Sequence, residues 1–214
     1  MSCCCPQNLA TGKFFSRFAR RYHKRYLKKG LEKTQQQLVA GVQQAGVAGA
    51  SLLEIGCGVG YLHQFLLQHG ASQAVGIDLS ARMIEEARAL AAEQNLSERT
   101  AYRQGDFVDL AAEVDAADVS LLDKVVCCYP DAESLVKKST ALTRRVYALT
   151  YPRDRRITRW GSRLMAAVFW LLRSPMRNYV HDPRVIEDWI IAAGFRKQSE
   201  STNFLWLTQI YTRP

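Results

Sequence analysis

The sequence has 214 residues, of which 48% are apolar, and a net charge of +9. This length supports one α/β domain with a sizeable core and is short for two, and the apolar share excludes a disordered chain. The longest apolar run, residues 164–172, has nine residues, too few to cross a bilayer, and the N-terminus lacks the apolar region of a secretory signal. We therefore expect a cytoplasmic protein with no transmembrane segment.

Positive charge is concentrated in two segments. Residues 1–33 hold nine Lys and Arg against one acidic residue, residues 153–177 hold seven Arg against one, and the rest of the chain sums to −5. Aromatic residues recur among the basic ones over 13–33, which predicts a basic helix, and a second helix is expected over 34–45. The first helix either packs on the domain with its charges solvated, or forms a lid or a contact with an anionic partner.

The six cysteines are Cys3, Cys4, Cys5, Cys57, Cys127 and Cys128. Adjacent cysteines suit neither a disulfide framework nor the Cys-x-x-Cys spacing of zinc sites. We therefore expect free thiols in a reducing compartment and no bound metal. For the first three, metal binding and acylation stay open as alternatives to the disordered tail that we expect.

An apolar run that leads into closely spaced glycines is the most informative stretch. Residues 52–60 read Leu-Leu-Glu-Ile-Gly-Cys-Gly-Val-Gly, and a helical pattern follows up to Gly70. Strand, glycine turn and helix in this order are typical of a nucleotide site, because glycine lets a ligand approach the backbone closely. The spacing Gly-x-Gly-x-Gly differs from the Gly-x-Gly-x-x-Gly of dinucleotide sites, which makes dinucleotide binding the weaker interpretation.

This stretch resembles motif I of class I S-adenosylmethionine-dependent methyltransferases, whose usual form is acid-x-Gly-x-Gly-x-Gly. The resemblance implies S-adenosylmethionine as the cofactor. It also implies a binding loop made of Glu54, Gly56, Cys57, Gly58 and Gly60. A tight turn that binds nothing is the alternative that this stretch alone leaves open.

A second predicted strand, residues 73–78, ends in an acidic residue. Asp78 lies 18 residues after Gly60, close to the offset of a ribose-binding acid in nucleotide-binding α/β folds. Its carboxylate can accept two hydrogen bonds from a ribose diol, and Leu79 would then flank the adenine. A helix capped by Ser80 is expected to follow.

A third predicted strand, residues 100–104, precedes Asp106 and Phe107. The methyltransferase family often has an acid in this place that contacts the adenine amino group. Asp106 matches that position, and Phe107 would stack beside the ring. The alternative is a turn aspartate at a strand end.

A fourth strand is predicted over residues 118–126, and we expect the methyl group and its acceptor near the strand end. Asp123 completes the cofactor-binding set that the resemblance implies, and Tyr129 lies in the loop before a helix capped by Asp131. Many enzymes that methylate exocyclic or amide nitrogens carry Asn/Asp-Pro-Pro-Tyr/Phe here. The sequence lacks that motif, which disfavours methylation of base amino groups.

The remaining pattern predicts a fifth strand over 145–151, a helix over 183–193 and two final strands over 196–203 and 205–212. The implied fold is α/β: a Rossmann-like, doubly wound, seven-stranded sheet that ends in an antiparallel hairpin. We expect two parts: a basic tail with helices over 1–46, and a methyltransferase domain over 47–214 with a helical lid inserted at about 153–180.

The layout also resembles magnesium-protoporphyrin O-methyltransferases, through the basic leading helix, the insertion after the fifth strand, Tyr179–His181 and Ala193–Phe195. This implies O-methylation of a small acceptor that is acidic or partly apolar. A hydroxyl acceptor needs a general base, for which Tyr129 and His181 are the candidates, whereas a carboxylate does not. The alternatives are an RNA-binding or RNA-modifying methyltransferase that uses the basic N-terminal helix, a catalytically inactive cofactor-binding scaffold, and peripheral membrane contact by residues 153–177.

Overall fold

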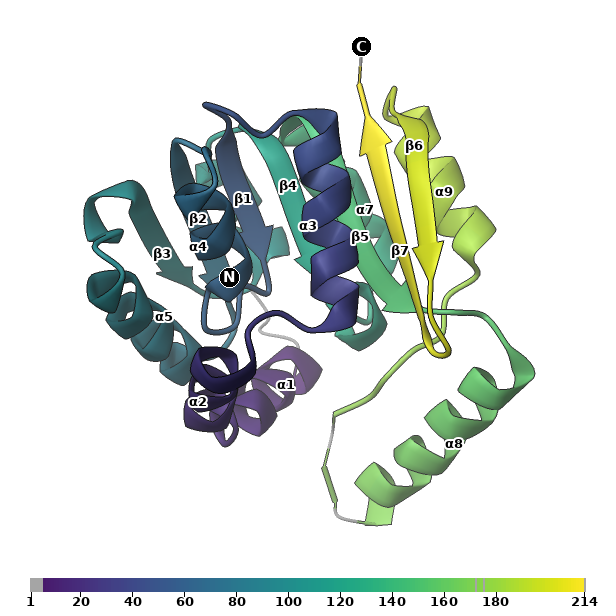
Figure 1. Ribbon diagram of the computed structural model, residues 1–214. Helices are drawn as coiled ribbons and strands as arrows, with labels where there is room; N and C mark the ends of the chain where they lie inside the picture. The colour runs from purple at the N-terminus through teal and green to yellow at the C-terminus, as the bar shows by residue number, and fades with distance from the viewer. Residues whose placement is uncertain (1–5, 172, 175, 214) are drawn as a thin grey trace.

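A seven-stranded sheet in the order β3-β2-β1-β4-β5-β7-β6 forms the centre of the protein (Figure 1). The computed structural model describes residues 6–171, 173–174 and 176–213, so Cys3–Cys5 and the expectation for them lie outside the described residues. The strands are β1 (Ser51–Ile55), β2 (Gln73–Asp78), β3 (Thr100–Gln104), β4 (Ala117–Asp123), β5 (Thr143–Pro152), β6 (Arg196–Thr202) and β7 (Trp206–Thr212).

The central strands are parallel and the last two form an antiparallel hairpin, as predicted. β1 pairs with β2 and β4, with Leu53 opposite Val75 on one side and Ser120 on the other. β7 runs antiparallel to both β5 and β6. The residues of β1 and β4 are almost continuously buried, because helices cover both faces of a parallel sheet. The expected Rossmann-like fold is confirmed.

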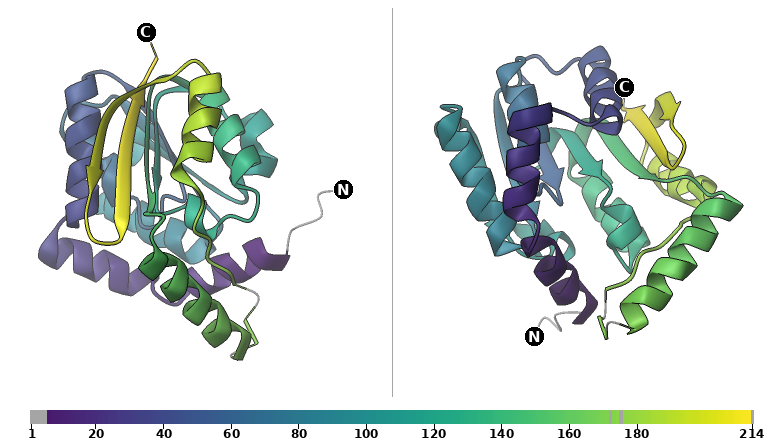
Figure 2. Two further views of the ribbon diagram at one scale, coloured as in Figure 1. Left: turned by 90° about the vertical axis from the view of Figure 1, so that its right-hand side faces the viewer. Right: turned by 60° about the horizontal axis from the view of Figure 1, so that its bottom comes forward.

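Helices lie in a layer on each side of the sheet (Figures 1 and 2). One layer is formed by α3 (Lys33–Ala45), α4 (Tyr61–Gln68) and α5 (Ala81–Glu93), and the other by α6 (Phe107–Leu110), α7 (Ala132–Ala141) and α9 (Pro183–Ala192). The predicted caps are present: the Ser80 hydroxyl accepts from Met83 N at 3.1 Å, and the Asp131 carboxylate accepts from Ser134 N at 3.0 Å. Each layer has its own apolar cluster, so the sheet separates two cores.

The single basic helix predicted over residues 13–33 is wrong, because the structure has two helices there, α1 (Pro6–Ser16) and α2 (Ala19–Lys29). A tight turn separates them, in which Phe18 N donates to Phe15 O at 2.9 Å. The break lets Phe15 face inward from α1 while Ala19 is fully buried at the start of α2. Local aromatic spacing alone did not reveal it.

The fourth strand also ends earlier than predicted, at Asp123 instead of residue 126. Lys124 has φ of +61°, a left-handed conformation that stops the strand, and a short 3₁₀ turn, η3 (Val126–Cys128), follows. Two other 3₁₀ turns are η1 (Ser97–Arg99) and η2 (Ala111–Glu113).

The insertion after β5 contains one long helix, α8 (Arg156–Leu171), which extends away from the sheet at the end where the parallel strands terminate (Figure 1). The helices α1 and α2 lie at the same end (Figure 2). Within the part of the chain that the structure describes, no helix has the length and apolarity needed to cross a membrane.

Candidate active site

A cavity of about 430 Å³ opens at the carboxyl ends of β1, β2 and β4, a size typical of small-molecule sites. α1, α2 and the start of β7 contribute to its walls together with the sheet. Its most important lining residues are Gly12, Phe15, Tyr22, Glu32, Gly56, Gly58, Val59, Asp78, Leu79, Asp106, Phe107, Asp123, Lys124, Val125, Cys128, Tyr129 and Trp206. The strand ends provide the polar groups and the helices enclose them.

The glycine loop after β1 requires its glycines for two different reasons. Gly56 and Gly58 have φ of +65° and +53°, values that residues with a Cβ rarely adopt. A Cβ on Gly56 would lie 2.5 Å from Val125, so packing excludes it, whereas a Cβ on Gly58 would meet no atom of the described chain within 4 Å. Because Gly58 lines the cavity, its missing side chain leaves space for a ligand.

Three of the predicted loop residues do not line the cavity. The Cys57 thiol is buried, and it packs against Gly76 of β2, where an added Cβ would lie 2.9 Å from the sulfur. Burial raises the pKa of this thiol well above its usual range. Gly60, with φ of +78°, precedes α4, and a Cβ there would collide with Gln64.

Glu54, the third, forms a buried pair with His63. Its Oε2 lies 2.5 Å from His63 Nδ1 and accepts from His63 N at 3.2 Å, and both side chains are almost completely buried. Burial raises the pKa of Glu54, while the bonds from His63 oppose the shift. The pair joins β1 to α4, so we infer that Glu54 holds the loop in place without contacting the ligand.

Glu54→Gln should therefore act on stability more than on binding. The amide keeps an acceptor for His63 but removes the charge, so we expect a loss of about 1.5 kcal/mol in the free energy of unfolding and a change in cofactor affinity of less than about threefold. Urea unfolding and calorimetric titration measure the two effects. A large loss of affinity without a loss of stability would instead assign Glu54 to direct contact.

Asp78, at the end of β2, holds the glycine loop and the start of α5. Its Oδ2 accepts from Gly58 N at 2.9 Å and its Oδ1 accepts from Ser80 N at 2.8 Å. Burial raises the pKa of this carboxyl to about 6, although both backbone hydrogen bonds oppose the shift. Each oxygen can accept a further hydrogen bond and Asp78 lines the cavity, so this residue can both shape the loop and bind a diol.

Asp106 connects three segments at the far wall of the cavity. Its side chain caps α6 by accepting from Val108 N at 3.0 Å, accepts from the Tyr129 hydroxyl at 2.7 Å, and forms a short hydrogen bond with the Asn8 amide of α1. Burial and the adjacent carboxylate raise the pKa of Tyr129. The hydroxyl is thus a donor to Asp106, and Asn8 ties the N-terminal helix over the cavity.

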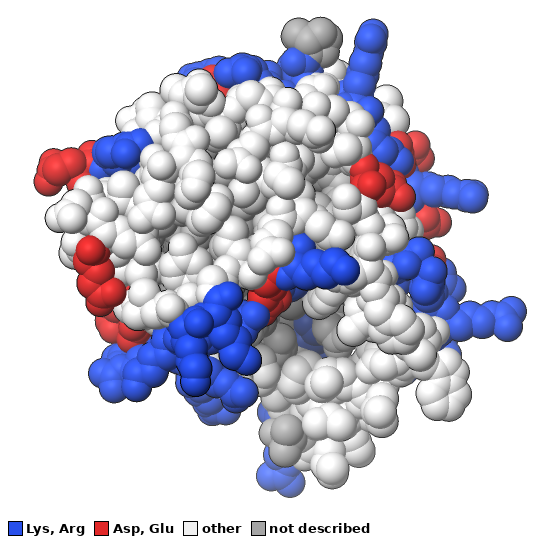
Figure 3. All heavy atoms as spheres, in the orientation of Figure 1, with Lys and Arg blue, Asp and Glu red and all other residues white. Residues whose placement is uncertain are grey.

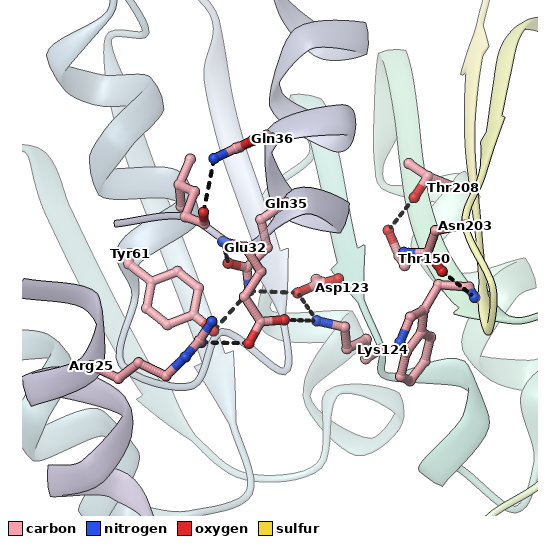
Figure 4. Close-up of polar contacts among 12 residues, drawn as sticks. Arg25, Glu32, Gln35, Gln36, Tyr61, Asp123, Lys124, Thr150, Asn203 and Thr208 are labelled. Atoms are coloured by element: carbon pink, nitrogen blue, oxygen red, sulfur yellow. Dashed lines mark hydrogen bonds and ion pairs between the residues drawn. The ribbon is translucent and has the colours of Figure 1, made fainter. Parts of the chain in front are cut away.

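The end of β4 carries a polar network that reaches α3 (Figure 4). Gln35 of α3 donates to the Tyr61 hydroxyl at 2.9 Å and to Asp123 Oδ2 at 3.0 Å. Lys124 Nζ lies 2.8 Å from Glu32 and 3.6 Å from Asp123. Asp123 Oδ1 is buried and has no hydrogen-bond partner among the described residues, although it belongs to a residue of the cavity wall.

Lys124 is held in a left-handed backbone conformation by contacts from three directions. Its N–H donates to Thr150 O at 2.8 Å, its ammonium pairs with Glu32, and it lies 5.3 Å from the ring centre of Trp206. Burial opposes the shift, but the hydrogen bond and charge of Lys124 hold the pKa of Glu32 below its usual range. Left-handed non-glycine residues cluster at functional sites.

His181 lies behind the cavity wall and is not among the lining residues. Its Nε2 is 3.1 Å from Val126 O, its ring stacks on Tyr179, and Tyr179 N donates to Cys127 O at 2.7 Å. Burial lowers the pKa of His181, so the imidazole is neutral at pH 7. These contacts hold the turn that follows Lys124.

The structure thus brings eight predicted residues to one cavity: Gly56, Gly58, Asp78, Leu79, Asp106, Phe107, Asp123 and Tyr129. Glu54, Cys57, Gly60 and His181 lie behind its walls. Sequence reasoning missed the contributions of Phe15, Glu32 and Trp206, which come from distant segments. The basic and aromatic pattern of the N-terminus was the only signal for the first two.

Comparison with known proteins gives a consistent result. Residues 52–146 match a family described as a methyltransferase domain. Ubiquinone biosynthesis O-methyltransferase of Coxiella burnetii is 26% identical over 159 residues, which cover 72% of this chain and 67% of that protein. The protein of the same name from Chromobacterium violaceum is 33% identical over 107 residues, covering 48% of this chain and 43% of that protein.

Solved structures share the whole architecture. Magnesium protoporphyrin IX methyltransferase from Synechocystis PCC 6803 with bound SAH superimposes with a TM-score of 0.76 at 21% identity, covering 97% of this chain and all of that one. A structure of the same enzyme with bound SAM gives a TM-score of 0.73 at 20% identity, covering both chains completely. At these identities the likeness establishes the fold.

Proposed function

We propose that this chain, a class I S-adenosylmethionine-dependent methyltransferase, transfers the methyl group to an oxygen of a small, partly apolar acceptor. The observation that carries the proposal is the cavity at the strand ends. It combines a glycine loop open to a ligand, three carboxylates that follow strands β2, β3 and β4, and an adjoining apolar wall under α1. The O-methyltransferase names of the relatives support oxygen as the accepting atom.

The residues present fit S-adenosylmethionine. The unpartnered Asp123 Oδ1 and the open space at Gly58 are two features that a bound ligand would complete. We assign the ribose to Asp78, the adenine to Leu79, Asp106 and Phe107, and the positively charged methionine end to the loop and Asp123. The cofactor supplies a methyl group that its sulfonium already activates, so the protein mainly has to orient the acceptor and exclude water.

The lining favours an acceptor with an apolar body. Phe15, Tyr22, Val125 and Trp206 line the cavity, whereas no described residue of the arginine-rich segment 153–177 does. Among the described lining residues, Lys124 is the one Lys or Arg, and Glu32 and Asp123 already neutralise it. We therefore favour an acceptor whose body is mainly apolar and whose one acidic group carries the accepting oxygen.

The geometry favours orientation over proton abstraction. The Tyr129 hydroxyl donates a hydrogen bond to Asp106, and burial raises the pKa of Tyr129. The phenol therefore stays protonated, which is the opposite of what a general base requires. His181 is neutral but separated from the cavity by the turn after Lys124. An acceptor oxygen that ionises without help, such as a carboxylate or an acidic phenol, fits this arrangement.

Tyr129→Phe should therefore reduce the turnover number by less than about tenfold and leave the pH dependence of kcat/KM unchanged. It removes a hydrogen bond to Asp106 but no proton acceptor. His181→Ala, measured in parallel, tests the other candidate. A loss of about 10² to 10⁴ with an altered pH profile in either variant is the signature of a general base.

The function itself is tested with methyl-labelled cofactor and a fractionated cell extract. We expect label in a small molecule that partitions into organic solvent, and alkaline hydrolysis then distinguishes a methyl ester, which is cleaved, from a methyl ether, which is not. Label in RNA would support the RNA alternative instead. Cofactor binding without label transfer to any fraction would support the inactive scaffold.

A further inference from the structure

The helix α8 exposes its apolar side to solvent. Five large apolar residues at helical spacing form a continuous stripe, which we call the α8 stripe. They are Ile157, Trp160, Leu164, Val168 and Leu171, with exposed fractions of 56%, 74%, 67%, 41% and 75%. A helix that only packs on its domain has such a stripe turned inward.

The inward side of α8 is small, polar or aromatic. Ser162 exchanges hydrogen bonds with Asn178, at 3.2 Å to its carbonyl and 3.0 Å from its side-chain amide. Phe169 is buried and contacts the ring of Phe14 in α1, with ring centres 5.7 Å apart. These contacts fix the orientation of α8, so the stripe points away from the protein.

Two more exposed apolar residues lie at the tip of the β6–β7 hairpin, beside the segment that leads into α8, and arginines flank α8 itself. Phe204 and Leu205, at the hairpin tip, are 65% and 42% exposed, and Leu205 O accepts from Arg153 N at 2.8 Å just before α8. Arg156 and Arg163 are exposed on the flank of α8. Arg156–Leu171, all of it described, contains no acidic residue.

The basic helix α2 adds to this surface. Its exposed residues include Arg20, Arg21, Lys24, Lys28 and Lys29, and α1, α2 and α8 lie at the same end of the protein (Figure 2). In Figure 3, drawn in the orientation of Figure 1, the region around α8 at the lower right is largely uncharged on its visible side. Lys and Arg lie at the borders of this region, and a dense basic cluster lies beside it.

We propose that this end of the protein docks on an anionic membrane surface, with the α8 stripe inserted among the lipids and the flanking arginines and α2 on their headgroups. A basic amphipathic helix with tryptophan on its apolar side has the composition of an interfacial helix. A second copy of the chain would bring like charges together, and RNA would leave the stripe uncovered. An anionic bilayer can cover both features, because its headgroups pair with the flanking basic residues and its interior takes up the apolar stripe.

The docking face coincides with the end at which the cavity lies. An acceptor dissolved in the lipid would reach the cavity without crossing bulk water, a consequence that rests on the function proposed above. Docking itself needs neither cofactor nor acceptor. A binding experiment without them therefore tests the docking surface independently of the methyl transfer.

The test is flotation of the full-length protein with vesicles of phosphatidylcholine, with or without phosphatidylglycerol. We expect binding only to the anionic vesicles. Trp160→Ser with Leu164→Ser should lower the partition coefficient by at least about tenfold. The matched control is Val185→Ser with Ile191→Ser, which removes exposed apolar residues of α9 and should change nothing.

The charge contribution is tested in the same way. Arg156→Gln with Arg163→Gln should weaken binding by about fivefold for each arginine at low salt. Arg144→Gln with Arg196→Gln, at the opposite end of the sheet, is the control with equal loss of charge. All these side chains are exposed, so unchanged melting temperatures verify the fold.

Several outcomes would overturn the proposal. One is no binding to anionic vesicles by the wild type. A second is a dimer in sedimentation that the stripe variant converts to a monomer without any vesicle binding. A third is salt-sensitive RNA binding by the wild type that the arginine variant loses, with no binding of either protein to vesicles.

Discussion

Asp78→Ala is expected to weaken the binding of S-adenosylhomocysteine by about thirtyfold, or on the order of 2 kcal/mol. The substitution removes a carboxylate that we assign to the ribose, and charge-assisted hydrogen bonds contribute energies of this size. It also leaves Gly58 N and Ser80 N without their acceptors, which loosens the loop. Calorimetric titration measures the loss.

Asp118→Ala is the matched control. Asp118 also accepts two hydrogen bonds, from Ser51 N at 2.9 Å and Ser51 Oγ at 2.8 Å, but at the other end of the sheet. This variant should lose stability and keep cofactor affinity. Equal affinity in the Asp78 and Asp118 variants would contradict the assignment of the ribose.

The pKa of Asp78 gives the same prediction a pH dependence. Only the ionised carboxylate accepts from both ribose hydroxyls, so cofactor affinity should fall as the pH drops through about 6. The free energy of unfolding has the opposite pH dependence, because the pKa of Asp78 in the folded protein lies above the ordinary 3.8. The stabilisation that Asp78 contributes is fully present below pH 3.8 and is lost as the pH rises through about 6. The pH-dependent part of the affinity should disappear in Asp78→Ala.

Gly58→Val should reduce cofactor affinity by more than about a hundredfold, the largest effect that we expect. An added Cβ at this position meets no atom of the described residues within 4 Å, so the valine side chain would occupy the space that we assign to the ligand. The left-handed backbone adds strain of about 1–2 kcal/mol to the folded state, so the melting temperature should fall modestly.

The chain offers a close control in Gly49→Val. Gly49 has φ of +71° and also has no atom within 4 Å of an added Cβ, but it lies in the loop before β1 and not in the cavity. Its variant should show similar strain with normal cofactor binding. Normal binding by both variants would mean that the glycine loop is only a turn.

Local sequence signals identified the strand ends because each signal is contiguous. The glycine loop, Asp78 and Asp106 follow their strands directly, and parallel strands bring their carboxyl ends together. The arrangement of α1 and α2 over the cavity was not predictable in this way. Its break at residues 17–18 depends on burying Ala19 and on Asn8 reaching Asp106, 98 residues away.

The end of β4 also depends on long-range contacts that a local sequence pattern does not reveal. An apolar run through Val126 predicts a longer strand, yet the backbone turns at Lys124. The conformation is stabilised by Thr150 O, Glu32 and Trp206, which belong to three distant segments. Propensity within the strand could not reveal contacts supplied by the rest of the fold, and these contacts shape the part of the cavity wall that Lys124, Glu32 and Trp206 line.

Binding of S-adenosylmethionine in the cavity at the strand ends is tested most directly by backbone ¹⁵N chemical-shift mapping during titration with S-adenosylhomocysteine. Binding at the strand ends should give saturable shifts that are largest at Gly56, Gly58, Asp78, Leu79 and Phe107, with little change in β6 and α9. No saturable shifts, or shifts confined to residues outside the cavity, would contradict it.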